Sequence, residues 1–409
     1  MTQAGPHSHA SGRPFLASYG GGHAQILIAL AAELERRGRD YDLMGLTTAD
    51  AAFRKAGLQT IPIARLIDPE ISGAVRDRAA DLAPPSGHPD MTAEQTLAYF
   101  TIGFADLVAR FGMAEAEERV ARLDRKAFEP VCAFERYFRL TGPSIVVSTT
   151  SPRFETAALR AARRLSIPSL AIGDMYLIAE QEWILTPGYA RDLTVISDVV
   201  ADILKATGGL SSRVHVLGNP AFDALAPSPA DAAVRMRERQ RLGIGERTCI
   251  LWPLGGAAEE VAGRMLLPPV EVAAFLDRLC DRDPGLTYVL RPHPNWPVTG
   301  LPLRHGCLDD RATLEAALLA SDMVCVEAST VGLQAVLRGI PTVCFNFADY
   351  VLYPDFGWAA KADTLEELSA IVLSKHYFAP PESLRAHVGG AAGRVADLMA
   401  RLEGGTQMS

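Results

Sequence analysis

The sequence predicts an α/β protein built from two doubly wound domains, each with a mostly parallel sheet. Short apolar runs typical of buried strands alternate with amphipathic helical patterns along most of the 409 residues. The Pro-containing segment APSPAD at 226–231 interrupts this alternation, and the pattern begins again with an apolar strand at 248–252. No internal repeat of solenoid length is present, so the two halves are interpreted as two domains.

The composition narrows the class of protein. Hydrophobic residues make up 48% and charged residues 22%, as in a soluble protein with a large core. The net charge of −8 argues against a nucleic-acid-binding protein, which would normally be basic. Cys249, Cys325 and Cys344 fall in predicted buried strands without CxxC spacing, which indicates reduced thiols in a cytoplasmic protein. No apolar run is long enough for a transmembrane helix, and residues 1–12 are expected to be disordered.

The first domain is expected to span residues 13–225. Its first strands are predicted at 13–18, 41–46 and 60–63, with helices between them. From about 71 to 140 a Pro-rich turn and long amphipathic helices, expected through 105–123 and 128–139, replace the alternation, which resumes at 144. We interpret this segment as a helical insertion that lines a groove or forms a homodimer contact.

The second domain is expected to span residues 226–375 and is centred on the stretch 321–345. Two short apolar strands flank a helical pattern that Gly339 and Pro341 close, so the strands should be parallel with a right-handed crossover. The turn into the helix is Glu327-Ala328-Ser329-Thr330, and Gly332 follows in the first turn. A Ser or Thr there can cap the helix, whose free N–H groups can bind an anion. The helices of 376–409 are expected to return to the first domain.

Unusual turns follow several predicted strands. Ligands of open α/β sheets bind outside the carboxyl ends of the strands, so these turns predict a shared cleft. Glycines such as Gly21, Gly22, Gly255 and Gly256 let backbone N–H groups approach a phosphate closely. For the Gly20–His23 turn, the alternative to phosphate binding is a tight strand–helix connection with a solvent-facing His23. The turns in question are Gly20–His23, Gly173–Asp174, Gly255–Gly256, Arg291–His293 and Glu327–Thr330.

Four segments, in this order and spacing, resemble the two-domain nucleotide-sugar enzymes of the GT-B fold. They are Gly20-Gly21-Gly22-His23, Leu217-Gly218-Asn219-Pro220 with Asp223, Leu290-Arg291-Pro292-His293-Pro294-Asn295, and Ser329-Thr330-Val331-Gly332 with Gly339-Ile340-Pro341. The family includes lipid-linked N-acetylglucosamine transferases, bacterial capsule transferases and UDP-N-acetylglucosamine 2-epimerases. The resemblance implies two facing Rossmann-like domains. It also implies a nucleotide-sugar donor, expected to be UDP-linked, and an acceptor that is a small molecule, a lipid or a glycan. Peripheral association of the protein with a membrane is expected as well.

The resemblance and the chemistry of group transfer suggest roles for single residues. A transferase must stabilise the leaving diphosphate and supply a base for the incoming hydroxyl. Catalytic candidates are His23 and Asp174, with Glu180 and Glu182 behind them; His23 is preferred because histidine titrates near neutral pH. The predicted substrate-binding residues are Gly21, Gly22, Gly255, Gly256, Arg291, His293, Glu327, Ser329, Thr330, Gly332 and Gln334.

Departures from the family pattern favour a transferase over an epimerase. Gln334 stands where many relatives carry an acidic residue that binds the ribose, and Glu327-Ala328-Ser329-Thr330 replaces the epimerase Asp-Ser-Gly-Gly. Asp281-Arg282-Asp283 spells a DxD motif but precedes a strand, at the edge opposite the cleft, so no metal or other cofactor is expected. A 2-epimerase-like isomerase or hydrolase and an inactive GT-B binding module are the alternatives.

Overall fold

The computed structural model describes residues 12–84, 90–255, 260–293 and 296–405. It divides into two compact units, which we call unit 1 (Met1–Asp223 with Gly389–Ser409) and unit 2 (Ala224–Val388). The boundary thus falls after Asp223, where sequence analysis placed it near 226. The chain returns to unit 1 only at Gly389, so helix α16 (Glu382–Arg385) belongs to unit 2 rather than to the returning segment. Residues 1–11 of the N-terminal stretch lie outside the described residues.

Unit 1 contains a six-stranded sheet in the order β2-β1-β3-β4-β5-β6. Every neighbouring pair is parallel, with Phe15 of β1 opposite both Asp42 of β2 and Val146 of β3. The strand order reverses between β1 and β3, which makes the carboxyl ends of these two strands the topological switch point. The strands are β1 (Phe15–Ser18), β2 (Asp42–Gly45), β3 (Val146–Thr149), β4 (Ser169–Ile172), β5 (Asp192–Val195) and β6 (Arg213–Val216).

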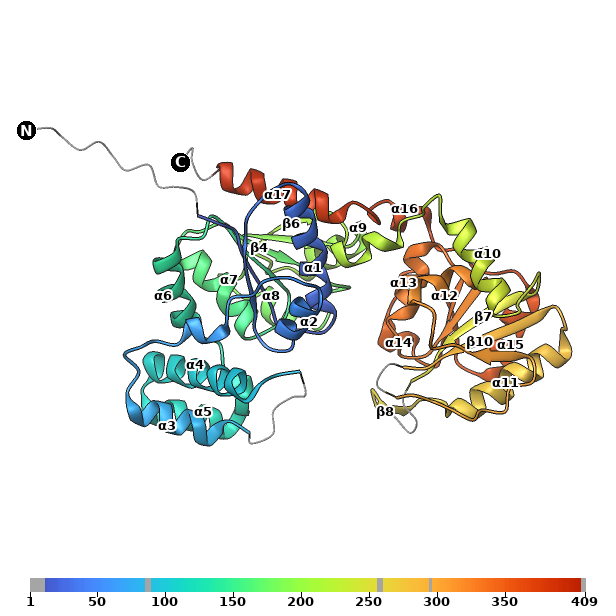
Figure 1. Ribbon diagram of the computed structural model, residues 1–409, viewed down its shortest axis with the longest axis horizontal. Helices are drawn as coiled ribbons and strands as arrows, with labels where there is room; N and C mark the ends of the chain where they lie inside the picture. The colour runs from blue at the N-terminus through green and yellow to red at the C-terminus, as the bar shows by residue number, and fades with distance from the viewer. Residues whose placement is uncertain (1–11, 85–89, 256–259, 294–295, 406–409) are drawn as a thin grey trace, which may run out of the picture. The chain divides into compact units, whose positions relative to one another are not determined.

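Helices cover both faces of this sheet, so alternate side chains of its central strands are buried on opposite sides. Leu16 of β1 packs with apolar residues of α1, α2 and α17, whereas Phe15 and Ala17 pack with the insertion and α7. Helix α17 contacts α1, and the two helices meet in Figure 1. These helices are α1 (Gly22–Arg36), α2 (Ala49–Lys55), α7 (Phe154–Arg164), α8 (Gln181–Ile184), α9 (Asp198–Thr207) and α17 (Ala391–Gly405).

The predicted insertion is helical, but the strand expected before it and one helix within it differ from expectation. The third strand expected at 60–63 is reduced to a single bridge between Ile61 and Met44, because Pro62 has no N–H to donate and η1 begins at Ile63. The long helix expected across 105–123 breaks at Gly112, whose φ of 81° favours glycine. The elements are η1 (Ile63–Leu66), α3 (Gly73–Leu82), α4 (Ala93–Phe111), α5 (Met113–Leu123), η2 (Asp124–Ala127) and α6 (Val131–Thr141).

Unit 2 contains a second parallel sheet, in the order β11-β10-β7-β12-β13-β14. Here the order reverses between β7 and β12, so their carboxyl ends form the switch point of this unit. The predicted strand–helix–strand stretch is β12-α13-β13. The strands are β7 (Thr248–Pro253), β10 (Leu286–Arg291), β11 (Gly306–Leu308), β12 (Met323–Val326), β13 (Thr342–Phe345) and β14 (Ala360–Ala362).

The remaining elements of unit 2 cover its sheet on both faces (Figure 1). They are α10 (Asp231–Arg241), α11 (Pro269–Arg282), α12 (Leu314–Ala320), α13 (Val331–Arg338), α14 (Ala348–Val351), α15 (Leu365–Ser374), and the hairpin of β8 (Glu260–Val261) and β9 (Arg264–Met265). The predicted fold class, α/β with two doubly wound parallel sheets, is therefore confirmed. Within the described residues no helix combines the length and the apolar character needed to cross a membrane.

Candidate functional site

The turn after β1 leaves the start of a long helix open at the switch point of unit 1. Gly21 precedes α1 with φ 58° and ψ −137°, a conformation that favours glycine, and both Gly21 and Gly22 are exposed. No side chain among the described residues caps α1, and its first turn carries no acidic residue. The N–H groups at this helix start are therefore available to an anion.

His23 lies in the first turn of α1, beside Asp174 from the turn after β4. Its Nε2 is 3.5 Å from Asp174 Oδ2, and both side chains are about four-fifths buried. The backbone N–H of Met175 donates to Asp174 Oδ1 at 2.7 Å, and Asn219 Nδ2 donates to the Asp174 carbonyl at 2.7 Å. Asn219, from the GNP segment of the family resemblance, thus holds the turn that carries Asp174, the second candidate for the catalytic base.

An acidic residue that was not predicted, Glu155 of α7, joins the loops on either side of the switch point. Its side chain is fully buried and accepts hydrogen bonds from Tyr19 N (2.6 Å), Thr149 Oγ1 (2.6 Å) and Ser151 N (2.8 Å). Burial raises the pKa of Glu155, and the charge of protonated His23 and these donors act in the opposite direction. Glu155 therefore braces the β1 loop against the β3 loop next to His23.

Glu180, which sequence analysis placed behind the two catalytic candidates, also lies near them. Burial raises the pKa of Glu180, the negative charge of Asp174 adds to this increase, and protonated His23 lowers it. Glu182 is exposed. His23 is therefore surrounded by three carboxyl groups, from α7, the β4 turn and the segment before α8.

In unit 2, Glu327 follows β12 at the switch point and is only 4% exposed. Its Oε1 accepts a hydrogen bond from Leu267 N at 2.8 Å. Burial raises the pKa of Glu327 to about 7, against the opposing effects of the Leu267 N–H and the Trp252 indole. Gly255, which follows β7 on the other side of the switch point, is half-buried, and Gly256 lies outside the described residues.

The start of α13 carries the predicted diphosphate-binding residues. Ser329 Oγ accepts from Val331 N at 3.3 Å, whereas Thr330 is exposed and its side chain does not cap the helix. Gln334 is half-buried one turn later. Gly332 has a packing role in this structure, because a Cβ at this position would lie 2.0 Å from the Tyr353 hydroxyl.

Arg291 and His293 follow β10, the strand next to β7. Arg291 is half-buried and its NH1 donates to the Ala312 carbonyl at 2.9 Å, which holds the segment before α12. Arg291 forms no ion pair with any residue that the structure describes. The His293 ring lies 4.5 Å from the Trp296 ring, and the intervening Pro294 and Asn295 lie outside the described residues.

Comparison with known proteins identifies the fold. No protein-family model and no curated protein matches the sequence. Solved structures do match over nearly all of both chains: the glycotransferase of kitacinnamycin is 16% identical (TM-score 0.54, covering 96% of this chain and 99% of that one). The UDP-GlcNAc 2-epimerase from Neisseria meningitidis is 12% identical (TM-score 0.55, 95% and 100%), and Acinetobacter baumannii MurG is 14% identical (TM-score 0.51, 95% and 99%). The chain has the GT-B fold. The fold expected from the sequence resemblance is thereby confirmed.

The DxD motif of this GT-B chain is engaged in ion pairs at the amino-terminal edge of the second sheet. Asp281 pairs with Arg304 (2.6 Å) and His305 (2.9 Å), and Asp283 pairs with Lys375 (2.6 Å). Among the described residues, no group of three or more His, Cys, Asp or Glu side chains is placed to hold a metal ion.

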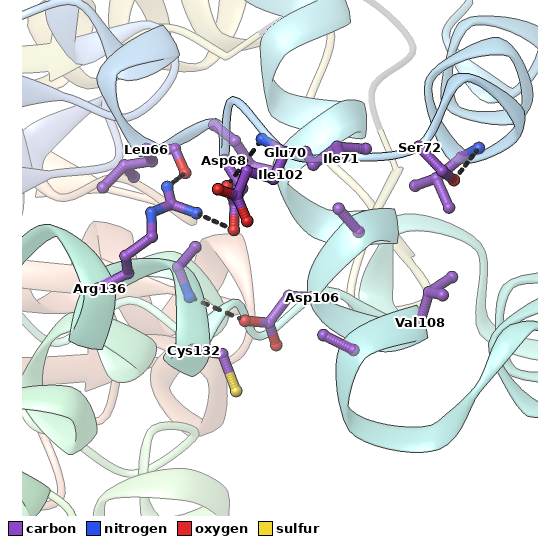
Figure 2. A pocket seen from close by; sticks show the side chains of 14 residues that line it. Leu66, Asp68, Glu70, Ile71, Ser72, Ile102, Asp106, Val108, Cys132 and Arg136 are labelled. Carbon is purple, nitrogen blue, oxygen red and sulfur yellow. Dashed lines mark hydrogen bonds and ion pairs between the residues drawn. The ribbon is translucent and has the colours of Figure 1, made fainter.

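A pocket of about 320 Å³ lies within the helical insertion, away from the switch-point residues (Figure 2). Three of its charged side chains have partners: Arg136 pairs with Asp68 at 2.9 Å, and Asp106 accepts from Ala133 N at 3.0 Å. Burial raises the pKa of Asp106 to about 6. None of the predicted site residues lines this pocket, so we assign it no role in the chemistry.

The pKa of Glu327 predicts a pH-dependent stability of unit 2. Because its folded pKa of about 7 exceeds the ordinary glutamate value of 4.5, the folded state binds the proton more tightly between these values. The free energy of unfolding should therefore fall as the pH rises through this window. Glu327→Gln keeps an oxygen for Leu267 N–H but cannot ionise, so its Tm relative to wild type should rise from about pH 5 to about pH 8. Exposed Glu271→Gln is the control, and parallel pH curves for Glu327→Gln and wild type would contradict the prediction.

Proposed function

We propose that this protein is a glycosyltransferase that moves a sugar from a UDP-linked donor to a hydroxyl group of an acceptor. The observation that carries the proposal is the His23–Asp174 pair, 3.5 Å apart at the switch point of unit 1, on a glycine turn that opens a helix. A histidine next to a carboxylate is a common general base. Glycosyl transfer to a hydroxyl needs such a base, and the GT-B fold supports this class of chemistry.

In the proposed reaction, His23 accepts the proton of the acceptor hydroxyl as that oxygen attacks the sugar carbon. His23 Nδ1 is buried, which leaves Nε2, beside Asp174, as the nitrogen that would meet the acceptor. The Asp174 carboxylate would stabilise the imidazolium that forms. Asn219 and Met175 hold Asp174 in place, and Glu155 holds the loop that leads to His23.

Unit 2 would bind the nucleotide. The start of α13, which the Thr330 side chain does not cap, and the remaining N–H groups of Arg291 would neutralise the leaving diphosphate. Glu327, with its raised pKa, would be partly protonated at neutral pH and could donate a hydrogen bond to a ribose or sugar hydroxyl as well as accept one. Gly255 would allow the backbone to approach the donor closely.

Incubation of the full chain with UDP-sugars, with and without candidate acceptors, tests this function. Mass spectrometry should detect UDP release and a glycosylated product only when an acceptor is present. Release of free N-acetylmannosamine from UDP-N-acetylglucosamine without an acceptor would instead indicate the epimerase reaction. Absence of UDP binding would indicate a binding module without donor chemistry.

Arg291→Ala should weaken UDP binding by about 1.5–3 kcal/mol, because a charge-assisted contact is lost. This corresponds to roughly a 10- to 150-fold increase in Kd, measured by titration calorimetry. Since Arg291 also holds the Ala312 carbonyl, the Tm of the variant is measured in parallel. Arg304→Ala, which removes an arginine paired with Asp281, is the matched control. An unchanged Kd in Arg291→Ala would place the diphosphate elsewhere.

We also infer that the protein works in the cytoplasm. All six cysteines are free, and Cys249, Cys280, Cys325 and Cys344 are buried. Burial raises the pKa of the Cys325 thiol to about 12, so this group is unreactive. Unpaired core thiols are typical of proteins from a reducing compartment.

A further inference from the structure

A pocket of about 470 Å³ lies inside unit 1, between the carboxyl edge of the sheet and the helical insertion. One side of the pocket is formed by residues of the loops after β1, β2 and β3, and the other side by residues of α4 and η2, with Pro84 and Met91 at its margin. The pocket therefore uses the same β1 and β3 loops that Glu155 braces beside His23. The residues that matter here are Tyr19, Thr96, Tyr99, Phe100, Arg125 and Arg153.

Aromatic rings form a preformed wall of the pocket. Tyr99 is buried and stacks on Phe154 with ring centroids 4.5 Å apart and an interplanar angle of 15°. Tyr19 meets Tyr99 edge to face at 6.4 Å, and their hydroxyl oxygens are 3.4 Å apart. Phe100 adds a third ring 5.7 Å from Tyr99. Such a wall suits a flat aromatic or apolar ligand, because the rings are already ordered before binding.

Arg153 supplies a cation without a counter-ion. Its Cζ lies 4.7 Å above the Tyr19 ring, its Nε is buried without a hydrogen-bond partner, and it forms no ion pair with the described part of the chain. Its backbone has φ 67° and ψ −109°, a conformation that favours glycine and costs about 1–3 kcal/mol for other residues. The presence of arginine at a position whose backbone conformation favours glycine indicates that the Arg153 side chain has a function.

Further polar groups open on the same space. Burial raises the pKa of Tyr99, while the positive charges of Arg153 and Arg125 both lower it, so both guanidinium groups act on this one phenol. Thr96 contributes a buried hydroxyl that has no partner among the described residues. Within a chain of net charge −8, this pocket is locally cationic.

We propose that this pocket binds the acceptor through an anionic group, a carboxylate or a phosphate, carried on an aromatic body. The inference rests on the proposed transferase function, because it places the substrate that His23 would deprotonate. A partly buried cation without a counter-charge is costly, and an anionic ligand would remove that cost. The guanidinium fork of Arg153 matches two oxygens of a carboxylate or phosphate, while the rings of Tyr19 and Tyr99 contact the aromatic part.

Titration calorimetry on the full chain tests the proposal without any nucleotide sugar. Phenyl phosphate and benzoate are the anionic aromatic probes, and benzyl alcohol and inorganic phosphate each lack one of the two features. We expect phenyl phosphate or benzoate to bind at least about 10-fold more tightly than either control. The tighter of these two anionic probes identifies the anionic group. Equal binding of benzyl alcohol, or no binding of either anionic probe, would overturn the proposal.

Variants of Arg153 separate ligand binding from folding. Arg153→Gly should weaken phenyl phosphate binding by about 10-fold or more, with a Tm no lower than wild type because the backbone strain is relieved. Arg122→Ala is the control, because Arg122 is an exposed arginine of the helical insertion that does not line the pocket. This variant should change neither the affinity for phenyl phosphate nor the Tm. Wild-type affinity in Arg153→Gly would overturn the proposal. If that variant does not fold, Arg153→Gln decides the matter in the same way, since it keeps the length and loses the charge.

The proposal and the transferase function can fail separately. Loss of probe binding in Arg153→Gly without any UDP-sugar turnover would support the anion site and contradict the transferase. The opposite outcome is turnover with neutral acceptors at a rate that Arg153→Gln does not change. This result would support the transferase function and overturn the proposed binding of an anionic acceptor at Arg153.

Discussion

Replacing His23 by alanine should lower the turnover number by about 10²–10⁴-fold and leave the affinity for UDP unchanged. The loss follows from removing the proposed base, whose Nε2 lies 3.5 Å from Asp174 Oδ2. UDP affinity should persist because the proposed diphosphate contacts belong to unit 2. Initial rates with a saturating donor, together with calorimetric titration of UDP, measure both quantities on one variant.

A second histidine–carboxylate pair in unit 1 provides the matched control. His215 of β6 lies 2.8 Å from Asp192 of β5, but this pair is away from the carboxyl ends of the strands. His215→Ala should therefore retain wild-type turnover. If His23→Ala instead lost UDP affinity and kept the wild-type dependence of turnover on pH, His23 would act as a phosphate contact and not as the base.

Much of the fold followed from local patterns in the sequence. The stretch 321–345 combined two apolar strands with a helix closed by Gly339 and Pro341, and it forms β12-α13-β13. The alternation of such units predicted parallel sheets, and parallel sheets bring the turns after their strands to one edge. For this reason the sequence alone predicts that His23 and Asp174, which are far apart in sequence, belong to the same edge of the sheet.

Long-range contacts account for what the sequence did not predict. Glu155 stands in the first turn of α7, where an acidic residue is ordinary, and its bond to Tyr19 N spans 136 positions. Gly332 resembled a phosphate-binding glycine, but only the folded chain shows that the Tyr353 hydroxyl occupies its Cβ position. Asp223 resembled a family motif residue and here accepts from Ala391 N (2.7 Å) and Ala392 N (2.9 Å) at the start of α17.

Glu155→Ala should produce the largest loss of stability, at least about 3 kcal/mol in unit 1. It leaves Tyr19 N, Thr149 Oγ1 and Ser151 N without their acceptor, and a buried unsatisfied donor costs about 1–3 kcal/mol. The Tm of unit 1 should fall by roughly 6–12 °C. Faster hydrogen exchange in α1 and α7 would locate the change, and turnover should fall with it because the loop before His23 loses its brace.

Glutamine variants at the two buried glutamates should behave differently, and this contrast separates hydrogen bonding from simple packing. Glu155 uses both oxygens as acceptors, so the amide nitrogen of Glu155→Gln must face a donor, at a cost of about 1–3 kcal/mol. At Glu327 the backbone hydrogen bond from Leu267 N engages Oε1 alone, and the amide oxygen of Glu327→Gln can accept this bond in its place. Thermal unfolding should therefore show a lower Tm for Glu155→Gln and no loss for Glu327→Gln at neutral pH. Equal Tm values for Glu155→Gln and wild type would mean that packing alone, and not the carboxylate, holds the β1 and β3 loops together.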